Sequence, residues 1–69
     1  MNCNLREKTL VKQLRPGDVI FDPEGYTCNV EKVNIGDLDI RLLVYYYGYR
    51  YRLLIYNSYD KVIKTTIPT

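Results

Sequence analysis

The chain of 69 residues carries ten basic residues, eight acidic residues and no histidine, and 46% of its residues are hydrophobic. This length is that of one domain, residues 1–69, and the hydrophobic share argues against a disordered segment. The formal net charge of +2 is too small to predict, by itself, a surface that follows nucleic-acid phosphates.

The first part of the chain predicts short strands separated by turns. Residues 1–7 carry little pattern and are interpreted as a flexible arm, whereas residues 8–67 are expected to form a β-barrel. A first strand is predicted from Thr9 to Gln13. In the following segment LRPGDVI, Pro16 and Gly17 favour a turn, and the Asp18 carboxylate is suited to accept hydrogen bonds from nearby backbone amides.

The next reversal is DPEG, residues 22–25, and a half-buried strand of alternating residues follows it. The segment NIGD, residues 34–37, leads into the longest β-patterned run, Asp39 to Tyr56, and a last strand covers residues 61–67. No stretch of ten or more residues has the apolar period of a helix. The predicted fold class is therefore all-β, as a single small five-stranded, partly open barrel.

The run from Asp39 to Tyr56 is predicted to be a hairpin that reverses at Gly48. A two-residue type II′ turn with glycine in its first position pairs Tyr47 with Arg50. In this register the inward residues are Leu38, Ile40, Leu42, Val44 and Tyr46 on the first arm, and Tyr49, Tyr51, Leu53 and Ile55 on the second. The rest of the predicted core consists of Val11, Leu14, Ile20, Val30, Val33 and Val62.

The same register predicts an outward face that is aromatic, apolar and cationic. We expect this face to be a binding site, and its residues are Leu43, Tyr45, Tyr47, Arg50, Arg52, Leu54 and Tyr56. Tyrosine and arginine are favoured at the centres of protein interfaces, so the ligand is expected to be a protein partner, or a second copy of the chain in a homodimer. Binding of single-stranded nucleic acid through stacked rings and guanidinium groups is the alternative. A third interpretation is structural, in which the cross-strand pairs only brace the hairpin.

The sequence does not indicate catalysis. It contains no nucleophile motif and no glycine-rich phosphate loop, and its acids are scattered over turns and strand edges. We therefore predict no enzyme activity, no catalytic residue, no cofactor, no metal and no small-molecule substrate. Cys3 and Cys28 are too far apart in sequence for a metal-binding or redox pair and are expected to be reduced thiols. With no secretory leader and no run long enough for a membrane helix, a cytoplasmic location without membrane contact is expected.

The order of these signals resembles the small SH3-like barrels encoded by bacteriophages and, more distantly, barrels of translation and transcription factors. The resemblance covers about residues 9–64. Its sharpest element is LRPGDVI, residues 14–20, and YTCNVEKV, residues 26–33, and KVI, residues 61–63, follow in the same order. It implies the barrel fold and a phage or mobile-element protein that docks on a host or viral protein. The tip YYYGYRYR, residues 45–52, is not part of this pattern.

Overall fold

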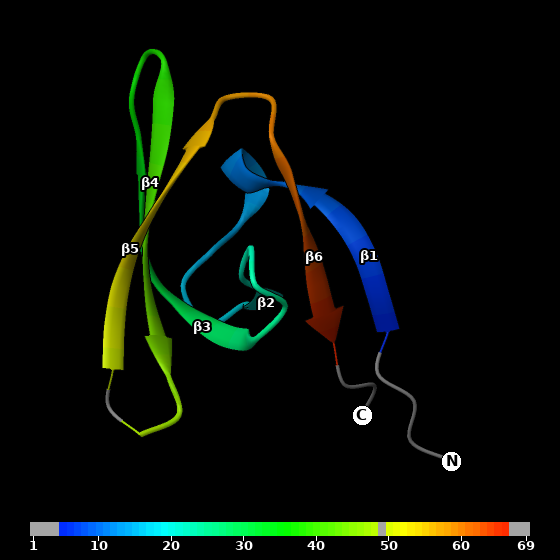
Figure 1. The fold of residues 1–69 in the computed structure, drawn as a ribbon. Coiled ribbons are helices and arrows are strands. Elements are labelled where there is room, and N and C mark those ends of the chain that lie inside the picture. Colours follow the sequence, from blue (N-terminus) through cyan, green and yellow to red (C-terminus); the bar gives the residue numbers. More distant parts are fainter. Residues whose placement is uncertain (1–4, 49, 67–69) are drawn as a thin grey trace.

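The alternating apolar residues and tight turns of the chain form one antiparallel sheet, and the computed structural model describes residues 5–48 and 50–66 (Figure 1). Its strands are β1 (Leu5–Leu10), β2 (Val19–Phe21), β3 (Thr27–Ile35), β4 (Asp39–Tyr46), β5 (Arg50–Asn57) and β6 (Lys61–Thr66). The all-β prediction is confirmed. Among the described residues, however, the sheet has six strands instead of the predicted five, and its order, β1-β6-β2-β3-β4-β5, is not closed.

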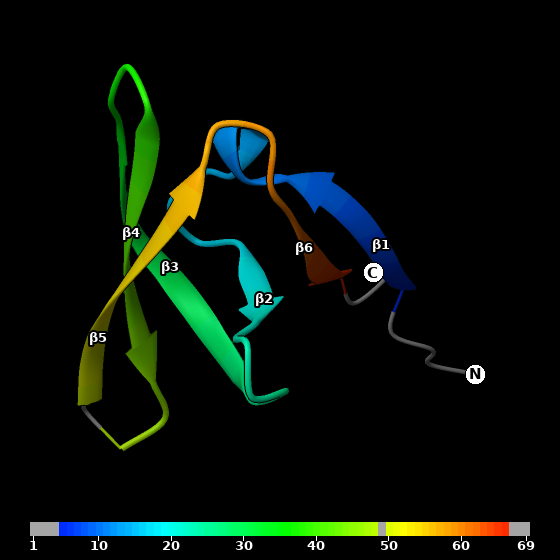
Figure 2. The same ribbon diagram turned by 45° about the horizontal axis from the view of Figure 1, so that its top comes forward.

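The sheet is strongly curled, and the short link between β5 and β6 requires this curl. β6 follows β5 along the chain but pairs with β1 and β2, so four strand spacings separate β5 from β6 in the sheet. In a flat sheet this separation would be about 19 Å. The link of residues 58–60 allows the two strand ends to be at most about 14 Å apart. The sheet therefore bends around the core, as the two views show (Figure 1 and Figure 2).

The first strand lies earlier in the chain than predicted. β1 pairs with β6 along its whole length, from Leu5 opposite Thr66 to Leu10 opposite Lys61. Residues 5–7, which were interpreted as part of a flexible arm, therefore belong to the sheet. Residues 1–4 of that predicted arm lie outside the described part of the chain.

The predicted strand from Thr9 to Gln13 is wrong beyond Leu10, because Val11–Gln13 is a short 3₁₀ helix. The backbone N of Val11 donates to the backbone O of Asp60 at 3.0 Å, and the N of Leu14 donates to the O of Val11 at 3.1 Å. A spacing of three residues in a 3₁₀ helix places two side chains on the same side. Val11 and Leu14 accordingly both lie in the core, as the sequence predicted.

The segment LRPGDVI makes the predicted turn before β2. Gly17 has a φ of +97°, which glycine adopts without a steric penalty. The Oδ2 atom of Asp18 accepts a hydrogen bond from the backbone N of Arg15 at 2.9 Å. Its Oδ1 atom lies 3.6 Å from Nζ of Lys64. Asp18 is thus a turn residue, as predicted, and it also ties the turn to β6.

The hairpin of β4 and β5 has a different register from the predicted one. Tyr46 lies opposite Arg50, so three residues, 47–49, connect the strands instead of two. Gly48, with a φ of +105°, is the central one of these three. Paired positions now differ by an even number, and the even-numbered residues of both strands therefore share one side of the sheet. The predicted pairing of Tyr47 with Arg50 is wrong.

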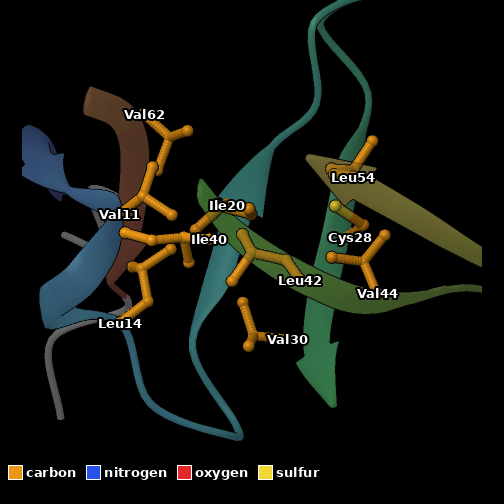
Figure 3. Packing of buried hydrophobic residues seen from close by; sticks show 10 residues of the cluster. All are labelled: Val11, Leu14, Ile20, Cys28, Val30, Ile40, Leu42, Val44, Leu54 and Val62. Atoms are coloured by element: carbon orange, nitrogen blue, oxygen red, sulfur yellow. The ribbon is translucent and has the colours of Figure 1, made fainter. Parts of the chain in front are cut away.

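This change of register exchanges the two faces of β5. Leu54 is buried opposite Leu42 and packs in the core (Figure 3), with 5% of its surface exposed. Leu53 and Ile55, which were predicted to be core residues, are 54% and 61% exposed. Tyr51 is also exposed, and Tyr49 lies outside the described residues.

Most of the remaining core is as predicted, including Ile20, Ile40, Leu42 and Val62. Buried Cys28 joins it, and Val33 packs against it as a partly buried residue. Leu38, predicted to point inward, is 85% exposed in the turn before β4. The errors in the core thus lie along β5, whose facing depends on the turn at Gly48, and at the turn before β4.

The observed register predicts unequal effects for two neighbouring leucines. Leu54→Ala removes buried methyl groups from the core and is expected to lower the free energy of unfolding by about 2–5 kcal/mol. Leu53→Ala, on the exposed side, is expected to lower it by less than about 1 kcal/mol. Urea unfolding of both variants at low protein concentration measures the difference. A larger loss from Leu53→Ala would contradict this register and favour the two-residue turn.

Candidate functional site

The observed register divides the seven residues of the predicted binding face between two sides of the hairpin. Leu43 and Tyr45 lie on the outward side of β4, where both are half-buried. Tyr47 is in the connecting loop and is 99% exposed. The other four residues share the core-facing side of β5, and they are Arg50, Arg52, Leu54 and Tyr56.

The expectation of one continuous aromatic and cationic face is therefore wrong. Leu54 is in the core, and Tyr56 is half-buried against it. The two arginines lie beyond the core on the inward side, where Arg52 is opposite Val44. The physical reason is the third loop residue, because one added residue reverses the direction of every side chain on the following strand.

On its inward side, the hairpin is joined to the turn between β2 and β3 by a network around Asp22. This side chain is 2% exposed. Its Oδ1 atom accepts hydrogen bonds from the backbone N of Glu24 at 3.0 Å and of Tyr26 at 2.8 Å. Its Oδ2 atom accepts a hydrogen bond from the hydroxyl of Tyr46 at 2.7 Å. A single carboxylate thus organises its own turn and also holds the end of β4.

Arg52 completes this network from β5. Its Nη1 atom lies 3.7 Å from Oδ2 of Asp22 and 3.0 Å from Oε1 of Glu24, to which it donates a hydrogen bond. The guanidinium group therefore has two carboxylates beside it. Buried carboxylates require such partners, because an uncompensated charge in the interior is strongly destabilising. Arg52 is consequently part of the fold and is already engaged by acids.

The network shifts the pKa values of its members away from neutrality. Burial alone would raise the pKa of Asp22, but the hydrogen bonds from Tyr46, Tyr26 and Glu24 and the charge of Arg52 together lower it below 3.8. Burial, assisted by the bond to Asp22, raises the pKa of Tyr46 from 10.0 to about 12. Burial and the nearby Asp22 charge raise the pKa of the Cys28 thiol from 9.0 to about 11. At neutral pH, Asp22 is therefore charged and the other two groups are neutral.

A groove of about 590 Å³ lies beside this network, between the β2–β3 turn and the hairpin tip. Its walls include the exposed rings of Tyr26 and Tyr47. They also include two acids and two arginines, so the charges of the walls balance. Within the described residues Arg50 makes no ion pair, whereas Arg52 is paired. The groove thus offers aromatic surface and one available guanidinium group.

The outward side of the hairpin carries an apolar surface that we call the outward hairpin face, formed by Leu43, Tyr45, Tyr51, Leu53 and Ile55. Leu43 lies opposite Leu53, and Tyr45 opposite Tyr51. The two tyrosine rings have their centroids 5.6 Å apart at an angle of 41°, which is a favourable tilted arrangement. Tyr51, Leu53 and Ile55 are each more than half exposed.

This face borders an unpaired strand edge. β5 is the last strand in the sheet order and pairs only with β4 among the described elements. Both views place β5 at the opposite side of the molecule from β1 (Figure 1 and Figure 2). In an antiparallel pair every second residue directs its backbone N–H and C=O away from the partner strand. The free side of β5 can therefore accept another strand.

Sequence reasoning missed Tyr51, Leu53 and Ile55 as surface residues and Asp22 as a structural centre. Whether Tyr51, Leu53 and Ile55 point outward depends on the number of loop residues. A single glycine in a run of tyrosines did not determine that number. For Asp22, the signal was present in DPEG, since aspartate readily bonds to the backbone amide two residues ahead. Its partners Tyr46 and Arg52, however, are 24 and 30 positions away.

Within residues 5–48 and 50–66, no group of three or more His, Cys, Asp or Glu side chains could hold a metal ion. In the same part of the chain, no helix has the length and hydropathy needed to span a membrane. Comparison of the chain with protein-family models, with curated proteins and with solved structures gives no match.

Loss of the Tyr46 hydroxyl is expected to destabilise the fold. Tyr46→Phe removes the 2.7 Å hydrogen bond to Asp22, and a hydrogen bond to a charged group contributes about 1.5–3 kcal/mol. Tyr45→Phe is the matched control, because it makes the same change one residue earlier on the outward side of β4. Urea unfolding at pH 7 should show a loss for Tyr46→Phe and almost none for Tyr45→Phe. Equal effects would show that the bond to Asp22 contributes nothing specific.

The lowered pKa of Asp22 predicts a loss of stability in acid. Folding favours the charged carboxylate, so its contribution is present above the unfolded-state pKa near 3.8 and disappears as the pH falls through the lower folded-state pKa. The free energy of unfolding should therefore decrease below about pH 4. Asp22→Asn should be less stable than the wild type at pH 7, and this difference should shrink between pH 4 and pH 2. Asp37→Asn, at an exposed turn position, serves as control, and a constant difference for Asp22→Asn would contradict the assignment.

Proposed function

We propose that this chain is a non-catalytic protein-binding module that recognises its partner through the outward hairpin face and the free edge of β5. The observation that carries this proposal is the exposure of Tyr51, Leu53 and Ile55, three successive outward residues on an edge strand. Long edges with exposed apolar residues invite strand pairing, and proteins that must stay unpaired block them with charges, prolines or bulges. β5 has none of these devices among its outward residues, and its two charged residues, Arg50 and Arg52, lie on the inward side near the hairpin tip.

The binding residues of this proposal differ in part from those expected from sequence. Leu43 and Tyr45 remain, and the three exposed residues of β5 join them. Tyr47 lies in the loop at the hairpin tip and Arg50 on the inward side of β5, whereas Arg41, opposite Ile55, is the charged residue beside the outward hairpin face. A peptide strand added to β5 would gain main-chain hydrogen bonds from the edge, while its side chains would contact the tyrosines and leucines of the face. Interfaces of this kind place aromatic and apolar anchors at the centre and charged groups at the rim.

The pKa values of the buried groups support a role without catalysis. General acid–base catalysis works best with a pKa near the operating pH, and Asp22, Tyr46 and Cys28 are all shifted away from it. A thiol is nucleophilic as the thiolate, and burial keeps that of Cys28 protonated.

Binding of single-stranded nucleic acid is the less supported function. It needs exposed rings beside free guanidinium groups, but Arg52 is paired with acids and lies on the other side of the hairpin from Tyr45 and Tyr51. On the outward side, Arg41 has its Nε atom 3.8 Å from Oδ2 of Asp39.

The finer fold assignment, an SH3-like barrel of the bacteriophage kind, belongs to the same proposal. The strong curl of the sheet and the return of β6 to β2 support it. So does the turn at Asp18, which carries the sharpest element of the resemblance. On this proposal β1 is an added edge strand, and the partner is a host or viral protein or a second copy of the chain.

Affinity capture from a lysate of the encoding organism tests this function with a matched pair of variants. Leu53→Lys places a charge at the centre of the outward hairpin face, whereas Leu38→Lys makes the same change at an exposed turn position. Proteins bound by the wild type and by Leu38→Lys should be depleted about tenfold or more with Leu53→Lys, a loss of about 1.4 kcal/mol. Identical recovery by all three proteins, with the chain's own copy counted among the captured proteins, would overturn the proposed surface.

The nucleic-acid alternative has its own readout, the fluorescence anisotropy of a labelled single-stranded oligonucleotide in 50 mM salt. We expect no binding by the wild type. Binding that survives Leu53→Lys and disappears with Arg50→Ala would replace protein recognition by nucleic-acid binding.

A further inference from the structure

We propose that the partner at this surface is a second copy of the chain, with β5 pairing antiparallel to its own copy across a two-fold axis at Leu53. This inference rests on the proposed function, because it names the occupant of the same face and edge. The result is a continuous sheet through two copies, with the free edges of both β5 strands removed. A two-fold interface requires a surface that is complementary to itself, and β5 meets this requirement in its charges and in its side-chain order.

The charges of β5 are unequal at its two ends. Arg50 and Arg52 lie in its first three residues. At the other end, Asn57 is opposite Asp39 and its backbone N donates to Oδ2 of Asp60 at 2.8 Å. Antiparallel self-pairing places the arginines of one strand against the end of the other that has no basic residue, and it keeps the like charges apart. A parallel arrangement would bring the arginines together, which is unfavourable for directly opposed charges.

The side-chain order of β5 selects the register of this pairing. With Leu53 opposite the partner's Leu53, Tyr51 faces the partner's Ile55, and the reverse pair is formed as well. All three exposed apolar residues of each copy then have apolar neighbours across the interface. A shift by one residue would join outward to inward side chains. A shift that placed Leu53 opposite the partner's Ile55 would leave Tyr51 facing the partner's Asn57.

The same register also gives Arg50 a contact in the partner copy. On the inward side, Arg50 lies opposite the partner's Tyr56. Arg50 has no ion pair within the described residues, in contrast to Arg52. In the dimer its guanidinium group therefore lies beside an aromatic ring. Arginine beside a tyrosine face is a favourable contact. Aromatic and aliphatic cross-strand pairs contribute further on the outward side. In the dimer, the free edge of β5, its three exposed apolar residues and Arg50 thus all gain contacts.

Cysteine cross-linking tests both the dimer and its register, in a Cys3→Ser background that keeps the buried Cys28. Directly opposed residues of an antiparallel pair have Cα atoms about 4.5–5.5 Å apart, within the range that a disulfide spans. Leu53→Cys should therefore form a covalent dimer under mild oxidation. Ile55→Cys is the matched control, because it is similarly exposed but would lie about 14 Å from its own copy. Alone it should form little covalent dimer, and it should cross-link to Tyr51→Cys when the two variants are mixed.

Light scattering over a concentration series separates this inference from the proposed function. The wild type and Leu38→Lys should form dimers, and Leu53→Lys should be monomeric at the same concentrations. Equal cross-linking of Leu53→Cys and Ile55→Cys, or a dimer that survives Leu53→Lys, would overturn the β5 dimer. A monomeric wild type would also overturn it, while the proposed function would stand if lysate proteins were still lost with Leu53→Lys. If neither self-association nor capture responded to Leu53→Lys, both would fail.

Discussion

The number of residues between Tyr46 and Arg50 is the constraint on which the rest of this structure depends. With three loop residues, the even-numbered residues of both β4 and β5 point inward, so that Leu54 enters the core opposite Leu42. Two loop residues would have placed Leu53 there instead. Because side chains alternate along a strand, this single choice fixes the environment of all eight residues of β5.

The place of Arg52 in the network around Asp22 is a consequence of that choice. Arg52 reaches Glu24 and Asp22 only because even-numbered residues of β5 point toward the β2–β3 turn. Tyr46 points to the same side and donates to the Asp22 carboxylate. The buried charge therefore has hydrogen bonds from two backbone amides and a hydroxyl, and a guanidinium group nearby. Such complete pairing is what makes a buried carboxylate compatible with a stable fold.

The register also explains why the hairpin exposes apolar residues. Once Leu54 and Tyr56 cover the core, Tyr51, Leu53 and Ile55 have no second layer to pack against within residues 5–48 and 50–66. A domain of this size buries only about 60% of its extended-chain surface on folding. Apolar side chains that stay exposed on an edge strand are therefore a substantial part of the apolar surface that association can still bury. The same feature that organises the interior thus produces the surface that we assign to a protein partner.

The amino-acid sequence by itself determined the all-β class, the turns at Gly17 and Gly48, and most of the core. These features depend on local chemistry, because glycine and proline set turn conformations and alternating apolar residues mark half-buried strands. The sequence also placed Val11 and Leu14 inward, although it assigned them to a strand. It did not determine the position of the first strand, since the 3₁₀ helix at Val11 is held by a bond to Asp60, far along the chain.

Only the tertiary structure decided which residues of β5 are available for binding. Turns of two and three residues around Gly48 are both sterically accessible, and each offers an apolar set to the core, either Tyr51, Leu53 and Ile55 or Leu54 and Tyr56. A contact between distant segments distinguishes them, because Arg52 reaches Asp22 and Glu24 only in the observed register. A local pattern cannot contain that information, since the deciding contacts join residues more than twenty positions apart.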